Sequence, residues 1–159
     1  MKIRDITIRN FRGFDNKSFD FDSRMNVVLG DNTTGKTTLL HAVQIALGAY
    51  LKSLTLVKGI SRNFKKGDHV SKYSESSKSF LPIVEKPSIE VNADFFIGEF
   101  NIASKSLNKS TSSIWWKRET NKNSKITTGQ LMEAVERIEE KRRMADQNGV
   151  NSVFPLFLS

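Results

Sequence analysis

The sequence predicts an α/β fold in which an antiparallel β-layer packs on one long, mostly buried helix. Three observations predict it. A short apolar run ends at a glycine-containing loop, a helical pattern begins directly after that loop, and runs of alternating apolar and polar residues lie on both sides of these segments. An α/β arrangement lets all of these segments bury their apolar sides against one another.

The first two segments alternate as half-buried strands do. Residues 2–11 alternate with one irregularity at Asp5 and Ile6, and residues 17–22 alternate more cleanly. We expect these two segments to pair.

A strand and a helix are predicted next. Residues 25–29 form an apolar, β-branched run typical of a buried parallel strand, and residues 37–51 contain no proline and read as a helix. The polar stripe of this helix is narrow and contains His41, Gln44, Gly48 and Lys52. We expect the rest of its surface to be buried, namely Leu39, Leu40, Val43, Ile45, Ala46, Leu47 and Leu51.

The second half of the chain predicts further strands. Residues 89–96 are expected to turn at Gly98 and Glu99 into a partner strand over 100–103, and residues 113–119 form another strand. Because neighbouring strand residues face opposite sides, one of Trp115 and Trp116 is expected to be buried and the other exposed; we favour packing over base stacking for the outer ring.

The remaining segments are predicted as loops, a helix and a final strand. The Ser-rich residues 74–79 and 104–113 are expected to be mobile loops. A capping box over residues 127–130 favours a helix that runs to about Gln147, and its charged residues 139–143 are read as a solvated face. Residues 153–158 are expected to form one more strand.

The loop between the apolar run and the first helix fits the Walker A pattern G-x-x-x-x-G-K-[ST]. Its strand-before and helix-after context is the one that this pattern requires. We therefore expect a nucleotide-binding loop formed by Gly30, Asp31, Asn32, Thr33, Thr34, Gly35, Lys36, Thr37 and Thr38.

Each position of the pattern has a physical role. Gly30 allows a sharp exit from the strand, and Gly35 lets the backbone approach phosphates without a Cβ atom. Lys36 is expected to contact the β- and γ-phosphates of ATP, and the Thr37 hydroxyl is expected to bind Mg²⁺. A glycine-containing turn with a lysine at the helix start is the structural alternative.

Residues 3–14, Phe19-Asp20-Phe21 and Gly30-Asp31-Asn32, in this order, resemble the opening of an ABC-type P-loop ATPase head of the RecF/SMC/OLD group. The resemblance implies the N-terminal lobe of a P-loop NTPase. It also implies that Arg12 lies near the nucleotide phosphates and that Thr38 contacts the α-phosphate. Thr33 departs from the family, which usually has glycine there, and a β-branched residue is hard to place if that position needs an unusual φ.

The resemblance covers only this lobe. A Q-loop, a signature motif, a Walker B strand and a switch histidine are not found. The nearest Walker B candidates fail, because a polar residue, Asn92, interrupts residues 91–94 and because the run 153–158 is followed by Ser159 rather than by acidic residues. We therefore predict no catalytic residue in this chain. Residues 1–159 are expected to be the N-terminal part of an ATPase head, inactive alone, within a full-length ATPase. After Lys52 the chain also resembles, more weakly, Septu-type and retron-linked phage-defence ATPases.

Composition excludes several classes of protein. The chain has no cysteine, which excludes disulfides, and its two histidines are too few for a zinc site. No apolar run is long enough for a membrane span, and the N-terminus is unlike a signal peptide, so we expect a cytoplasmic protein without membrane contact. The formal net charge of +8 favours an acidic partner such as DNA. The basic residues Lys58, Arg62, Lys65, Lys66, Lys72 and Lys78 form either a solvated surface or a nucleic-acid contact.

The leading hypothesis is therefore an ATP-binding lobe of a DNA-associated ATPase, acting in repair, chromosome maintenance or anti-phage defence. Its expected partners are a second head in a homodimer and DNA or a DNA-acting nuclease. One alternative is another nucleotide-binding protein: a transporter ATPase subunit, a GTPase or a small-molecule kinase. In a transporter subunit, Phe11 or Phe14 could stack on the base. A GTPase is disfavoured, because the sequence 121–124 lacks the aspartate that recognises guanine. The other alternative is a non-catalytic basic binding module with a vestigial loop.

Overall fold

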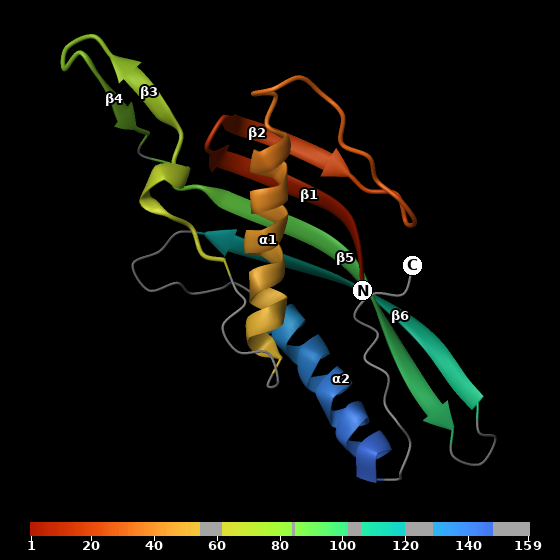
Figure 1. Cartoon of the computed structure of the whole chain (residues 1–159). Helices are drawn as coiled ribbons and strands as arrows, with labels where there is room; N and C mark the ends of the chain where they lie inside the picture. Colours follow the sequence, from red (N-terminus) through yellow and green to blue (C-terminus); the bar gives the residue numbers. More distant parts are fainter. Residues whose placement is uncertain (55–61, 84, 102–105, 120–128, 148–159) are drawn as a thin grey trace.

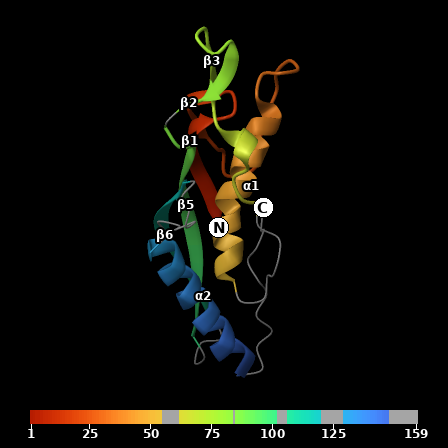
Figure 2. The same cartoon turned by 90° about the vertical axis from the view of Figure 1, so that its left-hand side faces the viewer.

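A four-stranded antiparallel sheet, with strand order β2-β1-β5-β6, forms the body of the protein in the computed structural model (Figure 1). The structure describes residues 1–54, 62–83, 85–101, 106–119 and 129–147. The long helix α1 lies across one face of the sheet, and α2 lies beside its lower end (Figures 1 and 2). The elements are β1 (Lys2–Phe11), β2 (Phe14–Asp20), α1 (Lys36–Ser53), the short helix η1 (Lys66–Asp68), β3 (Ser71–Ser74), β4 (Ser79–Pro82), β5 (Ser88–Asn101), β6 (Ser106–Glu119) and α2 (Gly129–Gln147). The predicted class, an antiparallel β-layer on the helix that follows the glycine loop, is confirmed.

The N-terminal strands pair as predicted. β1 and β2 are antiparallel, with Asp5 opposite Asp20 and Phe11 opposite Phe14. The other edge of β1 pairs with β5, and its register shifts between Ile3 and Asp5. This shift lies next to the break in alternation at Asp5 and Ile6. An extra residue in one strand reverses the side on which the following side chains lie, which explains the break.

The core lies between the sheet and the two helices. Ile45, Ala46 and Tyr50 of α1 are buried against the sheet, and the ring of Tyr50 meets that of Phe95 edge-on at 5.6 Å. α2 adds the buried residue Leu131. Each large apolar side chain buried in this way stabilises the fold by about 1.5–3 kcal/mol. This core fixes the position of α1, and hence that of the loop that precedes it.

Two hydrogen bonds from β6 fix α1 further. Trp116 Nε1 donates to the carbonyl of Ala46 at 3.1 Å, and Arg118 Nη1 donates to the carbonyl of Ile45 at 3.0 Å. Both side chains lie on the buried face of β6. Trp116 is fully buried and Trp115 is 42% exposed, which confirms the predicted division of the two rings.

The prediction of a buried strand over residues 25–29 is wrong. These residues form no strand, and Met25, Val27 and Leu29 are 77%, 69% and 86% exposed. A strand needs a neighbour for its backbone N–H and C=O groups, and within the described residues no strand lies beside this run. The run is as apolar as a buried strand, but apolar character alone does not supply the neighbouring strand that would bury it.

Three other expectations also need correction. β5 continues through the turn predicted at Gly98 and Glu99, and most of the loop predicted over 104–113 belongs to β6. The reason is that β5 and β6 pair along their whole length, up to Asn101 opposite Ser106. Backbone hydrogen bonds between the strands hold these polar residues in a strand, although their side chains show no apolar alternation. Leu40, expected to be buried, is 58% exposed. The predictions for Thr127, Thr128 and the strand over 153–158 lie outside the described residues.

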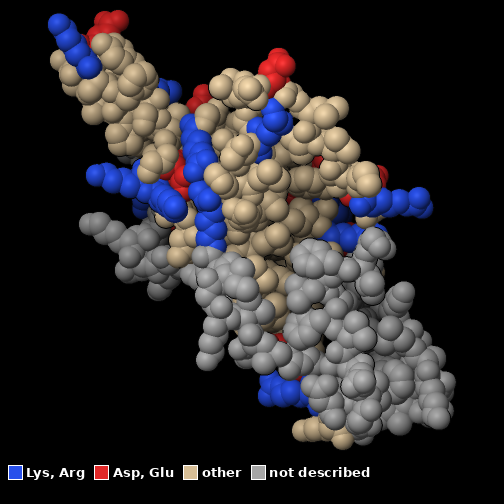
Figure 3. Space-filling view, in the orientation of Figure 1, with Lys and Arg blue, Asp and Glu red and all other residues tan. Residues whose placement is uncertain are grey.

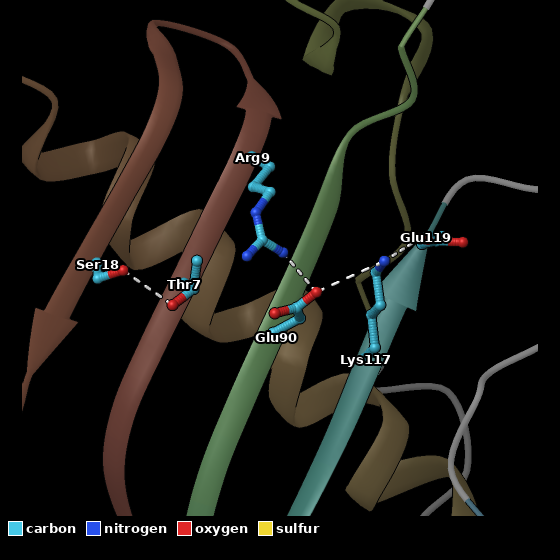
Figure 4. Close-up of polar contacts among 6 residues, drawn as sticks. All are labelled: Thr7, Arg9, Ser18, Glu90, Lys117 and Glu119. Carbon is cyan, nitrogen blue, oxygen red and sulfur yellow. Dashed lines mark hydrogen bonds and ion pairs between the residues drawn. The ribbon is translucent and has the colours of Figure 1, made fainter.

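The sheet face opposite α1 carries a row of paired polar side chains (Figure 4). Thr7 and Ser18 share a hydrogen bond of 2.9 Å, and Arg9 bonds to Glu90 at 2.5 Å. Glu90 also lies 3.5 Å from Lys117. The hydrogen bond between Lys117 and Glu119 is the largest of the effects that raise the pKa of Lys117. In this group the charges of Arg9 and Lys117 are balanced by those of Glu90 and Glu119.

Candidate phosphate-binding site

The loop over residues 30–38 closes on itself through the backbone carbonyls of Gly30 and Asp31. Lys36 Nζ donates to the carbonyls of Gly30 and, at 2.7 Å, Asp31. The Thr34 hydroxyl donates to the same Asp31 carbonyl at 2.8 Å. An ammonium group has three N–H donors, so these two bonds hold Lys36 across the loop and leave one donor for a ligand.

The N-terminus of α1 lacks a capping side chain among the described residues. Gly35 is its N-cap residue, and its first turn contains no acidic residue. The first N–H groups of a helix are not used by the helix itself, and they carry the positive end of its dipole. The loop and the helix start therefore present N–H donors and Lys36 to the same region, which suits an anion such as a phosphate.

Gly35 is required at its position for two reasons. Its φ is +97°, and a Cβ atom there would lie 2.6 Å from Cζ of Phe14. The ring of Phe14, which also contacts that of Phe19 at 5.6 Å, thus supports the loop backbone directly. Phe11 is fully buried. Phe14 packs on the loop and Phe11 lies in the core, and neither arrangement favours the base-stacking role considered for them.

Thr33, which stands where the resembled family usually has glycine, adopts a left-handed backbone conformation. Its φ is +78°, a region that β-branched residues rarely adopt. Such a residue stores about 1–3 kcal/mol of backbone strain. Thr33 therefore has a backbone conformation usual for glycine, and its β-branched side chain makes that conformation strained.

Thr37 and Thr38 lie in the first turn of α1, as predicted. The side chain of Thr37 is exposed and forms no hydrogen bond with another described residue, so its hydroxyl is available to a ligand. Within the described residues, no group of His, Asp or Glu side chains could hold a metal ion by itself. A Mg²⁺ ion would thus need phosphate oxygens beside Thr37, which is how Mg²⁺ usually binds next to nucleotides.

Arg12 lies beside α1, within a network of three side chains. Its Nε donates to Oδ1 of Asp68 at 2.8 Å, and its Nη1 lies 2.5 Å from Nδ1 of His41. Since arginine can only donate, Nδ1 of His41 is the acceptor and the imidazole is neutral. The structure therefore brings Arg12 close to the helix that carries Thr37, although it binds two partners that the sequence reasoning did not identify.

Electrostatics favour the same protonation states. Burial, followed by the charges of Arg62 and Arg12, lowers the pKa of His41, while Asp68 raises it and Lys65 lowers it further. Burial alone would raise the pKa of Asp68, but hydrogen bonds from Lys65 and Arg12 outweigh this effect and the pKa falls below its ordinary value. Asp68 is thus ionised and His41 neutral at neutral pH.

The sequence contains one signal for Asp68. It is the only acidic residue between Lys58 and Lys72, inside the basic segment. A single carboxylate among many cations indicates a specific ion pair, but the sequence does not say which cation it binds. His41 was read only as part of a polar stripe.

The described part of the basic segment surrounds η1 and the β3–β4 hairpin, which projects from one end of the molecule (Figure 1). Lys and Arg side chains gather on this side of the surface (Figure 3). Lys65, Lys66, Lys72 and Lys78 are exposed, and Lys58 lies outside the described residues. No described helix has the length and apolar character needed to cross a bilayer.

Comparison with known proteins gives a consistent result. The model of a family described as "AAA domain" matches residues 5–157. The DNA replication and repair protein RecF of Leptospira interrogans is 33% identical over 101 residues, which is 60% of this chain and 27% of that protein. RecF of Agathobacter rectalis is 29% identical over 109 residues, 69% of this chain and 27% of the relative. RecF of Listeria welshimeri is 46% identical over 43 residues, 27% of this chain and 12% of the relative. The chain thus spans about a quarter or less of the length of these relatives.

Proposed function

Because the chain belongs to the AAA domain family, as an N-terminal lobe of the RecF/SMC type, we propose that residues 30–38 bind ATP together with Mg²⁺. The observation that supports this best is the loop itself. Lys36 lies across it, bonded to two of its carbonyls, and the helix that follows has neither a capping side chain nor an acidic residue in its first turn. Such a site favours a polyphosphate over a neutral ligand.

The roles of the individual residues follow from their positions. Backbone N–H groups of the loop and of the start of α1 would hold the phosphate oxygens, apart from that of Thr34, which donates to the Asp31 carbonyl at 3.3 Å. Lys36 would neutralise the phosphate charge. The Thr37 hydroxyl would take one coordination position on Mg²⁺, and Thr38 would contact the α-phosphate. When bound, Mg²⁺ supplies neutralisation of the phosphate charge.

The lobe is expected to need further parts for hydrolysis. No residue of the sequence supplies a Walker B carboxylate or a signature motif, so turnover requires motifs from elsewhere and a second head. The exposed apolar run over residues 25–29 supports incorporation into a larger sheet, since such a run is stable when covered on both faces. The relatives are named as DNA replication and repair proteins, and by extension we assign the full-length protein to DNA-associated ATPases.

Thermal denaturation in the presence of nucleotides tests the binding step. Mg-ATP at a concentration one hundred times its Kd should stabilise the protein by about 2.7 kcal/mol. The shift should shrink without Mg²⁺, shrink for Thr37→Val, and vanish for Lys36→Ala. Lys72→Ala is a matched control, because it also removes an exposed lysine but lies on β3 (Ser71–Ser74), outside the loop. An unchanged melting temperature for the wild type at every nucleotide concentration would favour a vestigial loop in a basic binding module.

A further inference from the structure

Asp68 is a carboxylate that is 1% exposed, at the end of η1. Its Oδ1 accepts from Arg12 Nε at 2.8 Å, and its Oδ2 accepts from the backbone N–H of Lys65 at 2.8 Å. Its own carbonyl accepts from the backbone N–H of Arg12 at 2.9 Å. Asp68 thus binds Arg12 through both its side chain and its main chain.

The other end of the guanidinium is held by α1. Nη1 of Arg12 lies 2.5 Å from Nδ1 of His41, and the cation lies 5.5 Å from the centre of the Phe11 ring. These contacts fix the plane of the guanidinium. Of its five N–H donors, the two on Nη2 have no partner among the described residues, and the side chain keeps 29% of its surface exposed.

This arrangement lies beside the Walker A loop. His41 follows Thr37 by four residues, so the two side chains lie on the same face of α1, one turn apart. Phe14, two residues after Arg12, touches Gly35. The turn between β1 and β2 therefore runs along the phosphate-binding loop and its helix, with Arg12 on the helix side.

We propose that Asp68 is a positioning residue for nucleotide binding, which holds the guanidinium of Arg12 ready to contact a phosphate of ATP. A free arginine side chain loses rotamer entropy when it is fixed. The Asp68 carboxylate and the His41 imidazole restrict the Arg12 side chain before the ligand arrives, so binding need not pay that cost. This inference rests on the proposed binding of ATP at residues 30–38.

The strained backbone of Arg12 fits this role. Its φ is +53°, a left-handed conformation that non-glycine residues seldom adopt. The bond from its N–H to the Asp68 carbonyl holds the residue there. Neighbouring bonds, such as that from Val70 N–H to the Asn10 carbonyl at 3.3 Å, join the same two segments. The end of β1 is thus attached to the segment around η1 in the conformation that directs Arg12 to α1.

A double-mutant cycle tests the proposal. The Kd for Mg-ATP is measured for the wild type, Asp68→Asn, Arg12→Ala and the double variant. We expect Asp68→Asn to raise the Kd about tenfold and to have no further effect in the Arg12→Ala background, because the two residues act as one unit. Asp94→Asn is the matched control: it removes a carboxylate that pairs with Arg4 at 3.6 Å on the same sheet.

The outcomes separate the two proposals. If the wild type binds Mg-ATP, Lys36→Ala abolishes binding and Asp68→Asn leaves the Kd unchanged, the positioning role is wrong while the proposed function stands. If the effects of Asp68→Asn and Arg12→Ala add, Asp68 acts on the fold and the role is again wrong. If the wild type binds no ATP, both proposals fail.

A measurement on the unmodified protein covers the case in which Asp68→Asn does not fold. The Nε–H signal of Arg12 in a nitrogen-15 spectrum, assigned with Arg12→Lys, should be protected from exchange with water before ligand is added. It should shift when Mg-ATP binds and remain protected. A signal that exchanges freely, or that does not move on saturation with Mg-ATP, overturns the proposal.

Discussion

Gly35→Ala should destabilise the protein through a clash between the added Cβ atom and the ring of Phe14. The added Cβ atom would lie 2.6 Å from Cζ and 2.7 Å from Cε1 of Phe14, closer than such atoms approach in real structures. It would also force an alanine to adopt a φ of +97°. Overpacking costs about 1–3 kcal/mol and left-handed strain a similar amount. Since the loop can relax in part, we expect a loss of about 3 kcal/mol.

For a chain of this size, 1 kcal/mol changes the melting temperature by about 2–4 °C, so the expected decrease is about 6–12 °C. Unfolding in urea, followed by the fluorescence of the fully buried Trp116, gives the free energy directly. Phe14→Leu removes the clashing ring atoms, so the double variant with Gly35→Ala should recover about half of the loss. Gly13→Ala is the control, because its Cβ atom meets nothing within 4 Å. A Gly35→Ala protein as stable as the wild type, or one that Phe14→Leu does not rescue at all, would show that the Phe14 ring does not exclude a Cβ atom at residue 35.

Three further changes test other contacts. Thr33→Gly should raise the free energy of unfolding by up to about 1 kcal/mol, because relief of strain at a φ of +78° exceeds the entropy cost of glycine; a loss above 1 kcal/mol in urea would contradict this. The pKa of His41 is lowered from 6.5 in the folded protein, so the stability that neutral His41 contributes is present above pH 6.5 and is lost as the pH falls through the lowered pKa. The wild type should therefore lose more unfolding free energy between pH 7 and pH 5 than His41→Gln does. Curves of unfolding free energy against pH that run parallel for the two proteins would exclude this contribution. Trp116→Phe should cost about 1–2 kcal/mol, measured by circular dichroism, since its hydrogen bond to Ala46 and part of its packing are lost; equal melting curves would show that the bond adds nothing.

Local sequence patterns predicted the elements that depend on residues close together in the chain. Alternation over residues 2–11 predicted a half-buried strand, and adjacency alone predicted that Trp115 and Trp116 would face opposite sides. The helix after the loop was predicted to within two residues at each end, because its few polar positions recur at helical spacing and the segment contains no proline. The resemblance also marks Thr33 as a difficult position, since the family usually has glycine there, and its φ of +78° agrees with this.

Features that depend on distant residues were not predicted. Residues 25–29 are apolar like a buried strand, yet strand formation depends on a neighbouring strand that the local sequence does not encode. The polar part of β6 is a strand only because β5 pairs with it over its full length. The bond between Arg12 and Asp68 joins residues 56 positions apart, and spacing cannot select one cation among the many near that carboxylate.

Calorimetric titration of the protein with ATP tests whether residues 30–38 bind a nucleotide. In Mg²⁺ we expect a saturable heat with a stoichiometry of one ATP per chain, and weaker binding when Mg²⁺ is removed. We expect no heat for Lys36→Ala, because the Lys36 ammonium lies across the loop on the carbonyls of Gly30 and Asp31. Binding of equal strength by the wild type and Lys36→Ala would place the nucleotide elsewhere on this basic chain. That result would contradict the assignment of residues 30–38 as the phosphate-binding site.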